Sequence, residues 1–378
     1  MPSTGSRGAS SALFACVFVL LSAWAVRELR IGPVGKKAGE LLEPVVNSKI
    51  IEEYGNTELR YDYTGIAGVD FILRFLVVVF LPGALGIDQG IKLQAVYFLL
   101  SFFPVVAIMS IEAGRLRNKW SLIYFTSVWA VLYQSVGGAV MIPLYHLAYL
   151  KSSSAPNYWS PPSRAVSLPY AQALLPSLVL GYLLPTILVY FPQGNVFVTQ
   201  GYIAIWQIAP VIVNLLLFVL APTYAVGQPR TNRNEENLDG DVKYLKRVYM
   251  LSFFIGAISH WAAAAICFLS SDPNLSFMHA FWPRGDLFLG QMSALTLSEC
   301  VHYIFQMDCW IIFGSCLVWA YMAVLDMNRI SNQSFVPPAK ALAVMALNTV
   351  LFGPAATVAA VWYSRELKMA GLAKAKAL

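Results

Sequence analysis

Charged and amide side chains gather at the end of one long apolar run, between Ile108 and Trp120. Glu112, Arg115 and Lys119 lie at positions i, i+3 and i+7, so a continuing helix would place all three on one face. A carboxylate at membrane depth is costly and usually faces a partner or a cavity rather than lipid. The simpler interpretation is a solvated helix end from which the basic side chains reach the lipid headgroups.

A second group of polar residues lies beside a later apolar run. Glu299 and His302 are one helical turn apart, and Gln306, Asp308 and Trp310 follow them. A carboxylic acid in apolar surroundings has a raised pKa and stays protonated near neutrality, which suits it to donate a proton. A polar connector at the membrane interface explains these residues equally well.

Aromatic residues are abundant, with 10 Trp, 19 Tyr and 22 Phe. Most are expected to face lipid or to form belts at the two interfaces. Aromatic faces can also stabilise a carbocation, more strongly where water is excluded. A pocket for that chemistry would draw on residues such as Trp129, Tyr133, Trp206 and Trp310.

The metal and nucleotide motifs of several enzyme classes are missing. No D-D-x-x-D or N-D-x-x-D run is present, so the sequence predicts no paired-aspartate magnesium cluster for a diphosphate. The acidic stretch from Glu235 to Asp241 is the nearest approach, and we expect it to be solvated. There is no P-loop, H-E-x-x-H or G-x-S-x-G motif. We therefore expect no metal site and no cofactor.

The composition is that of a membrane protein. The 378 residues are 58% hydrophobic and 12% charged, with a mean hydropathy of +0.60, whereas ordinary globular domains carry about 25% charged residues. Apolar runs long enough to cross a bilayer recur throughout. They predict an all-α fold, a polytopic bundle of about eight or nine transmembrane helices that forms one membrane domain over residues 1–378.

The net charge of +6 does not indicate a nucleic-acid partner. The basic residues lie in short loops and at helix ends, where anionic headgroups and membrane topology explain them. The partner implied is the lipid bilayer itself, and the sequence does not define an oligomeric state. The five cysteines lie in or near apolar segments and form no C-x-x-C pair, so neither a disulfide framework nor a zinc site is predicted.

Three segments have alternative interpretations. The first apolar run, Ala12 to Val26, could be a retained anchor or a cleaved signal, and we favour the anchor. Residues 27–65 have the apolar rhythm of an amphipathic helix at the interface. Residues 151–169 are rich in Ser and Pro, and we expect an extramembrane loop that either caps one membrane face or serves as a linker.

The later spans are less regular. The run from Leu287 to Leu325 is too long for one crossing, so it could form two spans, or a re-entrant segment followed by a span that begins near Phe305. The remaining runs predict one span each: 66–85, 93–111, 121–144, 170–191, 196–222, 245–269 and 339–363.

Loop charge gives conflicting orientations. The basic residues Arg115, Arg117 and Lys119 mark one loop as cytoplasmic, and those between Arg230 and Arg247 mark another, three predicted spans later. Two loops separated by an odd number of crossings cannot lie on the same side. Either one segment between them does not cross, or one loop departs from the rule.

Four motifs occur in a characteristic order between about Ser110 and Tyr321. They are Glu112-Ala113-Gly114-Arg115 with Asn118, Ala171-Gln172-Ala173-Leu174-Leu175-Pro176, Gly181-Tyr182-Leu183-Leu184-Pro185-Thr186, and Phe305-Gln306-Met307-Asp308-Cys309-Trp310 followed by Trp319-Ala320. In these motifs the chain resembles the fungal integral-membrane terpene cyclases of the ascochlorin/ascofuranone and brasilane type.

The resemblance implies an enzyme that cyclises a farnesyl-derived substrate in secondary metabolism, in the endoplasmic reticulum membrane. Glu112 and Asp308 are the expected acid and its partner, with Glu299 and His302 as further catalytic candidates. The expected substrate-binding residues are Arg115, Asn118, Lys119, Gln306, Trp310, Trp129 and Tyr133.

Two ways of starting the reaction remain open. A protonated acid could open an epoxide or protonate an alkene, or basic side chains could draw off a diphosphate.

The rival interpretation of the whole chain is a small-molecule transporter or receptor, which would have the same spans and prolines. No internal repeat is visible between the halves, and many transporters have one.

Overall fold

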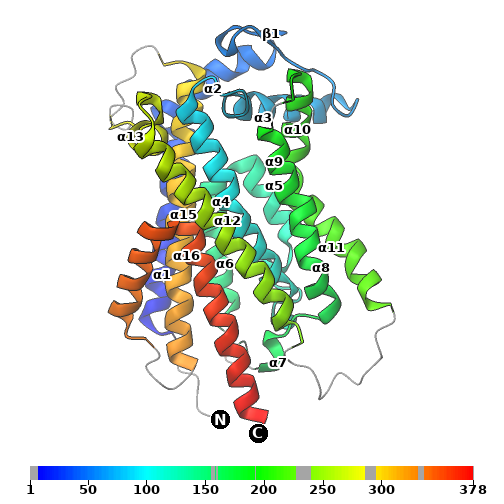
Figure 1. Ribbon diagram of the computed structural model, residues 1–378, viewed down its shortest axis with the longest axis vertical. Coiled ribbons are helices and arrows are strands. Elements are labelled where there is room, and N and C mark those ends of the chain that lie inside the picture. Colours follow the sequence, from blue (N-terminus) through cyan, green and yellow to red (C-terminus); the bar gives the residue numbers. More distant parts are fainter. Residues whose placement is uncertain are drawn as a thin grey trace.

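The computed structural model is an elongated bundle in which most helices run between two ends (Figure 1). It describes residues 7–154, 158, 161–191, 193–226, 240–285, 295–330 and 336–377. One end carries α7 (Pro161–Arg164) and the last turns of α16 (Pro338–Ala377), and we call it the terminal end. The opposite end carries α2 (Pro33–Val46) and is called the distal end.

Four helices run the length of the bundle without a break. They are α1 (Ala9–Val26), α4 (Gln89–Gly114), α12 (Val242–Leu269) and α15 (Leu297–Ile330). Helix α4 is the most enclosed candidate span, because 89% of its most apolar window is buried inside the protein. Helix α15 contains most of the apolar run that was predicted from Leu287 to Leu325, and it is one continuous helix from Leu297 onward. Residues 287–294 of that run lie outside the described part of the chain.

Two further crossings are broken helices. Helix α8 (Leu168–Leu178) passes through a π-helical turn (Val179–Leu183) into α9 (Leu184–Tyr190), with Pro185 just after the turn. Helices α10 (Val196–Trp206) and α11 (Ala209–Ala225) meet at 61°, with Pro210 at the second position of α11. Proline removes a helical hydrogen bond and crowds the preceding turn, which accounts for breaks at these points.

In the described part of the chain, seven helices are long and apolar enough to cross a membrane, or eight if α10–α11 counts as one span. This confirms the predicted all-α polytopic bundle. The only strands among the described residues are β1 (Ile50–Ile51) and β2 (Thr57–Glu58), an antiparallel pair in which Ile50 lies opposite Glu58.

The predicted span 121–144 is not a single crossing. Helices α5 (Thr126–Val136) and α6 (Gly138–Ser152) are separated at Gly137, whose φ of +117° is rarely adopted by other residues. Trp129 and Tyr145, eight residues before and after Gly137, have ring centroids 5.5 Å apart. The two helices are therefore antiparallel arms of a hairpin that enters and leaves at the terminal end.

This hairpin removes the conflict between the two basic loops. Between Asn118 and Asp241 the chain turns back once in α5–α6 and then crosses in α8–α9 and again in α10–α11. The described residues of both basic loops, Arg115 to Lys119 and Lys243 to Arg247, consequently lie at the terminal end, where Arg115 donates to the carbonyl of Arg164 and Arg164 pairs with Asp241. The positive-inside bias then predicts that the terminal end faces the cytoplasm.

We expect Lys119→Cys and Lys151→Cys to react with a membrane-impermeant maleimide from the same side of a sealed vesicle. Both lysines are exposed, and they lie before and after the hairpin. The measurement is labelling of intact and lysed vesicles, in a background in which Cys16 and Cys267 are replaced by Ala. Labelling of the two positions from opposite sides would show that residues 121–144 cross the membrane.

The last predicted span also turns back. In α16 the chain bends at Gly353 (φ +83°), and the Oγ1 atoms of Thr349 and Thr357 lie 3.3 Å apart across the bend. A Cβ at Gly353 would lie 2.9 Å from the ring of His260, so this glycine also permits close packing against α12. Residues 338–352 and 354–377 thus form a second hairpin, both arms of which point to the terminal end (Figure 1).

Helix α3 (Ala67–Leu85) lies across the distal end rather than along the bundle (Figure 1). Its start is fixed there by the buried carboxylate of Asp70, which accepts hydrogen bonds from the Thr64 hydroxyl and the backbone N–H groups of Thr64 and Gly65. The predicted span 66–85 has the right length and composition for a crossing. Hydropathy does not report helix direction, so the sequence could not distinguish the two arrangements.

The N-terminal helix is an integral part of the bundle. The Arg7 guanidinium forms an ion pair of 2.5 Å with Asp326 of α15, and the Ser22 hydroxyl donates to the carbonyl of Val140 in α6. These contacts favour the retained-anchor interpretation. The following segment, residues 27–65, contains a π-helical turn (Arg27–Ile31), α2 and the strand pair.

Candidate active site

A cavity of about 320 Å³ lies beneath α2 and α3, beside the tip of the α5–α6 hairpin. Its walls come from α2, α3, α4, α15 and the hairpin tip, so segments far apart in the sequence enclose it. Its lining is mainly apolar. A volume of this size is at the lower end of the range found for small-molecule pockets.

Aromatic rings form much of the wall. Phe98 and Phe102 lie one turn apart on α4, and the ring of Phe102 is 5.4 Å from that of Tyr133 in an edge-to-face arrangement. Phe80, Trp206 and Phe305 complete the group, with centroid distances of 5.2 Å between Phe80 and Trp206 and 4.9 Å between Phe80 and Phe305. The faces of such rings carry negative charge density that can stabilise a cation.

Asp308 supplies the carboxyl group of this cavity. The residue is 9% exposed, and its Oδ1 accepts a hydrogen bond of 2.6 Å from the backbone N–H of Ala139. That N–H is free because the break at Gly137 makes Ala139 part of the first turn of α6. Within the described residues the carboxyl group has no ion-pair partner, and Oδ2 accepts no hydrogen bond.

Two polar side chains that the sequence analysis did not select also line the cavity. Arg30 donates from Nη2 to the carbonyl of Val136 at 2.7 Å, and Gln134 donates to the carbonyl of Gln207 at 3.1 Å. Arg30 was missed because its segment suggested interfacial packing only. The one available signal was an arginine about one helical turn after the end of an apolar run, at Val26.

His302, Gln306 and Trp310 face away from this cavity. They lie at i, i+4 and i+8 on α15, and each contacts a backbone carbonyl of the short helix α13 (Phe277–Phe281). The distances are 3.1 Å from His302 Nε2 to the Ala280 carbonyl and 2.8 Å from Trp310 Nε1 to the Phe281 carbonyl. The three side chains therefore attach α13 to the bundle.

Glu299 stabilises the start of α15. Its Oε2 accepts hydrogen bonds from the backbone N–H and the hydroxyl of Thr296, and the Thr296 hydroxyl accepts from the Glu299 N–H at 3.3 Å. This is a capping box, and the T-x-x-E sequence was its signal. Glu299 also forms an exposed ion pair with Arg284 at 3.1 Å.

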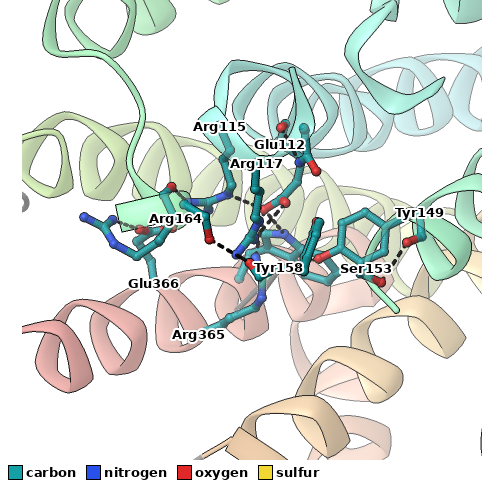
Figure 2. A network of polar contacts seen from close by, with 12 residues as sticks. Glu112, Arg115, Arg117, Tyr149, Ser153, Tyr158, Arg164, Arg365 and Glu366 are labelled. Atoms are coloured by element: carbon teal, nitrogen blue, oxygen red, sulfur yellow. Dashed lines mark hydrogen bonds and ion pairs between the residues drawn. The ribbon is translucent and has the colours of Figure 1, made fainter. Parts of the chain in front are cut away.

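Glu112 lies in a different site, a buried ionic network at the terminal end (Figure 2). Its carboxylate pairs with Arg115 at 2.8 Å, with Arg365 at 2.8 Å and with Arg117 at 3.3 Å. The Arg365 guanidinium also donates to the Tyr149 hydroxyl at 2.8 Å. Glu112 therefore joins the end of α4 to α16 and α6.

The network continues through a second carboxylate, Glu366. This residue pairs with Arg115 at 2.5 Å and also with Arg164, which in turn pairs with Asp241 at 3.0 Å. Although burial opposes it, the carboxylates of Glu112 and Glu366 raise the pKa of Arg115 above its ordinary value. The expectation of a solvated acidic stretch is wrong for Asp241, which is 3% exposed, while residues 235–239 lie outside the described part.

Part of the loop 151–169 covers this network. Arg164 is 1% exposed, and Val166 forms an isolated β-bridge with Arg115. The described residues of the loop are therefore held against the terminal end by ion pairs, although residues 155–157 and 159–160 lie outside the description.

The structure separates the two acids that the sequence analysis paired. Phe102 lines the cavity of Asp308, whereas Glu112 comes ten residues later on the same helix, a rise of about 15 Å.

Three other predicted substrate-binding residues also lie outside the cavity. Asn118 donates to the Glu112 carbonyl at 2.6 Å and so caps α4, and Lys119 is exposed beside it. Trp129 donates to the Leu122 carbonyl at 2.9 Å. Of the residues that the sequence analysis selected, the cavity brings together Asp308, Tyr133 and Trp206.

Comparison with known proteins identifies the family of this chain. The CtvD domain family matches residues 14–369. The terpene cyclase ascI of Acremonium egyptiacum is 29% identical over 269 residues, which cover 70% of this chain and 68% of that protein. The terpene cyclase ctvD of Aspergillus terreus is 37% identical over 163 residues, covering 42% of this chain and 46% of that protein.

A third relative is the FAD-dependent monooxygenase verC1 of Penicillium polonicum. It is 22% identical over 314 residues, which cover 82% of this chain but 37% of that protein. No solved structure matches the chain. The match over residues 14–369 and the curated relatives confirm the resemblance to fungal membrane terpene cyclases. The chain is a membrane-bound enzyme of the terpene cyclase type and belongs to the CtvD-domain family.

Proposed function

We propose that the chain cyclises an epoxidised farnesyl chain attached to an aromatic head, in a reaction started by proton donation from Asp308. The observation that carries this proposal is a buried carboxyl group in an aromatic cavity with no ion-pair partner among the described residues. An apolar environment disfavours a charged carboxylate, so the protonated acid is the form that this cavity favours. That form can donate its proton.

The proposed steps regenerate the catalyst. The Asp308 hydroxyl gives its proton to the epoxide oxygen, one C–O bond breaks, and the alkenes of the chain attack the resulting carbocation in turn. The aromatic walls stabilise the positive charge while excluding water, which would otherwise quench it. The Asp308 carboxylate, or a base near it, then accepts the proton lost from the final cation. The product is an isomer of the substrate.

Three observations favour an epoxide over ionisation of a diphosphate. The described residues contain no group of three or more His, Cys, Asp or Glu side chains that could hold a metal ion. Arg115, Arg117 and Arg365 already pair with Glu112, outside the cavity. In addition, a relative named as an FAD-dependent monooxygenase carries a region similar to this chain within a longer protein. A flavin monooxygenase on the same polypeptide would supply an oxygenated substrate.

The polar groups of the cavity suit the polar end of such a substrate. Arg30 uses one of its N–H groups on the Val136 carbonyl, and a guanidinium has five. We infer that the remaining donors, with Gln134, position the aromatic head. The proposed setting is secondary metabolism in the endoplasmic reticulum membrane, with a terpenoid small molecule as the partner.

The deciding experiment is incubation of membranes that contain the protein with an epoxyfarnesyl-arene and, separately, with farnesyl diphosphate. Cyclic isomers of the arene, with no product from the diphosphate, are expected. Turnover of the diphosphate alone would contradict the proposed initiation, and the absence of product from both would contradict the proposed substrate class.

We expect Tyr133→Phe to keep most of the turnover, because the ring that packs against Phe102 is retained. Tyr133→Leu should lower turnover about thirtyfold and release partly cyclised products, since a cation–π contact in a dry site contributes about 2 kcal/mol. Product analysis of the two variants by mass spectrometry measures this. A large loss in Tyr133→Phe would instead assign a role to the hydroxyl group.

A further inference from the structure

A second cavity, of about 280 Å³, lies between the two arms of the α16 hairpin and the last turns of α15. Its walls are mostly apolar side chains of the three helical segments: Ala323, Val324, Met327, Ala341, Val344, Met345, Ala360 and Val361. Helix α15 crosses the bundle, whereas the hairpin arms reach only part of the way. We call this cavity the hairpin groove.

The charged residues of the hairpin groove are all basic. Lys340 lies in the first turn of α16, on the first arm, and Lys368 lies on the second arm, fifteen residues after the bend at Gly353. Because the arms are antiparallel, both lysines lie toward the terminal end. Arg365 also lines the groove, one turn before Lys368, and its charge is shared with Glu112. Among the residues that the structure describes, no Asp or Glu lines the groove.

The length of the hairpin groove fits one leaflet of a bilayer. Lys340 and the bend at Gly353 are thirteen residues apart, a rise of about 20 Å along an α-helix. Half of the hydrocarbon core of a bilayer is about 15 Å thick. With the lysines at the level of the headgroups, the apolar part of the groove therefore reaches approximately to the middle of the membrane.

We propose that the hairpin groove binds an anionic phospholipid from the leaflet at the terminal end. Its phosphate would contact Lys340 and Lys368, and one acyl chain would lie along Val344, Met345 and Val361. A zwitterionic lipid would lack the net negative charge that the basic lining favours. The site is separate from the cavity of Asp308, and the proposal does not depend on the substrate.

The bound lipid would stabilise the hairpin against the bundle. The second arm is attached to α4 through the ion pair between Arg365 and Glu112, and to α6 through the Tyr149 hydroxyl. The first arm has a largely exposed apolar face, since Leu347 is 59% and Val350 is 74% exposed. A lipid between the arms contacts both of them and so joins the exposed arm to the fixed one.

The test is native mass spectrometry of the detergent-purified full chain titrated with dioleoyl phosphatidylglycerol or dioleoyl phosphatidylcholine. The double variant Lys340→Gln/Lys368→Gln is compared with Lys151→Gln/Lys243→Gln, which removes two exposed lysines from the same end outside the groove. Each basic residue near a membrane surface contributes about 1 kcal/mol, so the first variant should bind phosphatidylglycerol about thirtyfold more weakly. The control variant should bind it like the unaltered chain.

A third variant, Val344→Trp, fills the apolar part of the hairpin groove while keeping both lysines. It should also lose phosphatidylglycerol, whereas a diffuse attraction to surface charge would leave its binding unchanged and overturn the proposal. Equal loss in the two lysine variants would overturn it as well. Inorganic phosphate added in excess should not displace the lipid, and full displacement would show that the site binds the free anion. An unchanged melting temperature in each variant confirms that it is folded.

Discussion

Replacing Asp308 by Asn is expected to lower the rate of cyclisation by about 10²–10⁴-fold, the contribution usual for a general acid, and to leave the protein folded. The Asn side chain has the shape of the protonated acid, and its oxygen can still accept the hydrogen bond from the Ala139 N–H. It cannot supply a proton to an epoxide. The measurement is product formation in membranes, normalised to the amount of folded protein.

The matched control is Glu299→Gln, which neutralises an acid on the same helix. Glu299 pairs with Arg284 and caps α15 outside the cavity, so we expect turnover close to that of the unaltered chain. Its cost should be limited to a stability loss of about 1 kcal/mol from the weakened cap. Normal turnover in Asp308→Asn, or an equal loss in both variants, would refute the assignment of the acid.

Replacing Glu112 by Ala is expected to destabilise the protein strongly. The change leaves three guanidinium groups without their shared carboxylate, and Arg115 and Arg365 are both almost fully buried. Removing one partner of a buried ion pair typically costs about 3–5 kcal/mol. The measurement is the apparent melting temperature in detergent, together with the yield of monodisperse protein.

Glu112→Gln separates a structural role from a catalytic one. If the carboxylate mainly holds the network together, Glu112→Gln should lower the melting temperature, and Glu112→Gln/Arg365→Gln should recover part of the loss because the charges are again balanced. If Glu112 is the acid, Glu112→Gln should lose turnover at an unchanged melting temperature, as expected of Asp308→Asn. Loss of turnover without a change in melting temperature would assign the active site to the terminal end instead of the cavity of Asp308.

The two groups of polar residues thus differ in their chemistry. In the network, Glu112 and Glu366 are matched by arginines, which keeps them charged and joins α4, α6, α12 and α16 at one end of the bundle. In the cavity, Asp308 accepts a hydrogen bond from a backbone N–H and lines the same space as several aromatic rings. An acid of the first kind suits stability, and one of the second kind suits proton transfer.

The helical class, the membrane environment and the terpene cyclase resemblance could all be predicted from the amino-acid sequence. Each of these predictions rests on features that are visible within a short stretch of sequence. The features are the length of an apolar run, the scarcity of charged residues, and motifs such as Phe305 to Trp310. Hydrogen bonds between residues in the same helical turn can be predicted for the same reason. The capping box of Thr296 and Glu299 was readable in the sequence because both residues lie in one turn.

Which helices turn back, and which side chains come into contact, could be seen only in the three-dimensional arrangement of the helices. Gly137 and Gly353 reverse the chain, but hydropathy measures the length of an apolar segment and not its direction. Periodicity places His302, Gln306 and Trp310 on one face of α15 without revealing that α13 covers that face. Asp308 became the candidate acid, and Glu112 a member of an ionic network, through contacts with residues more than a hundred positions away.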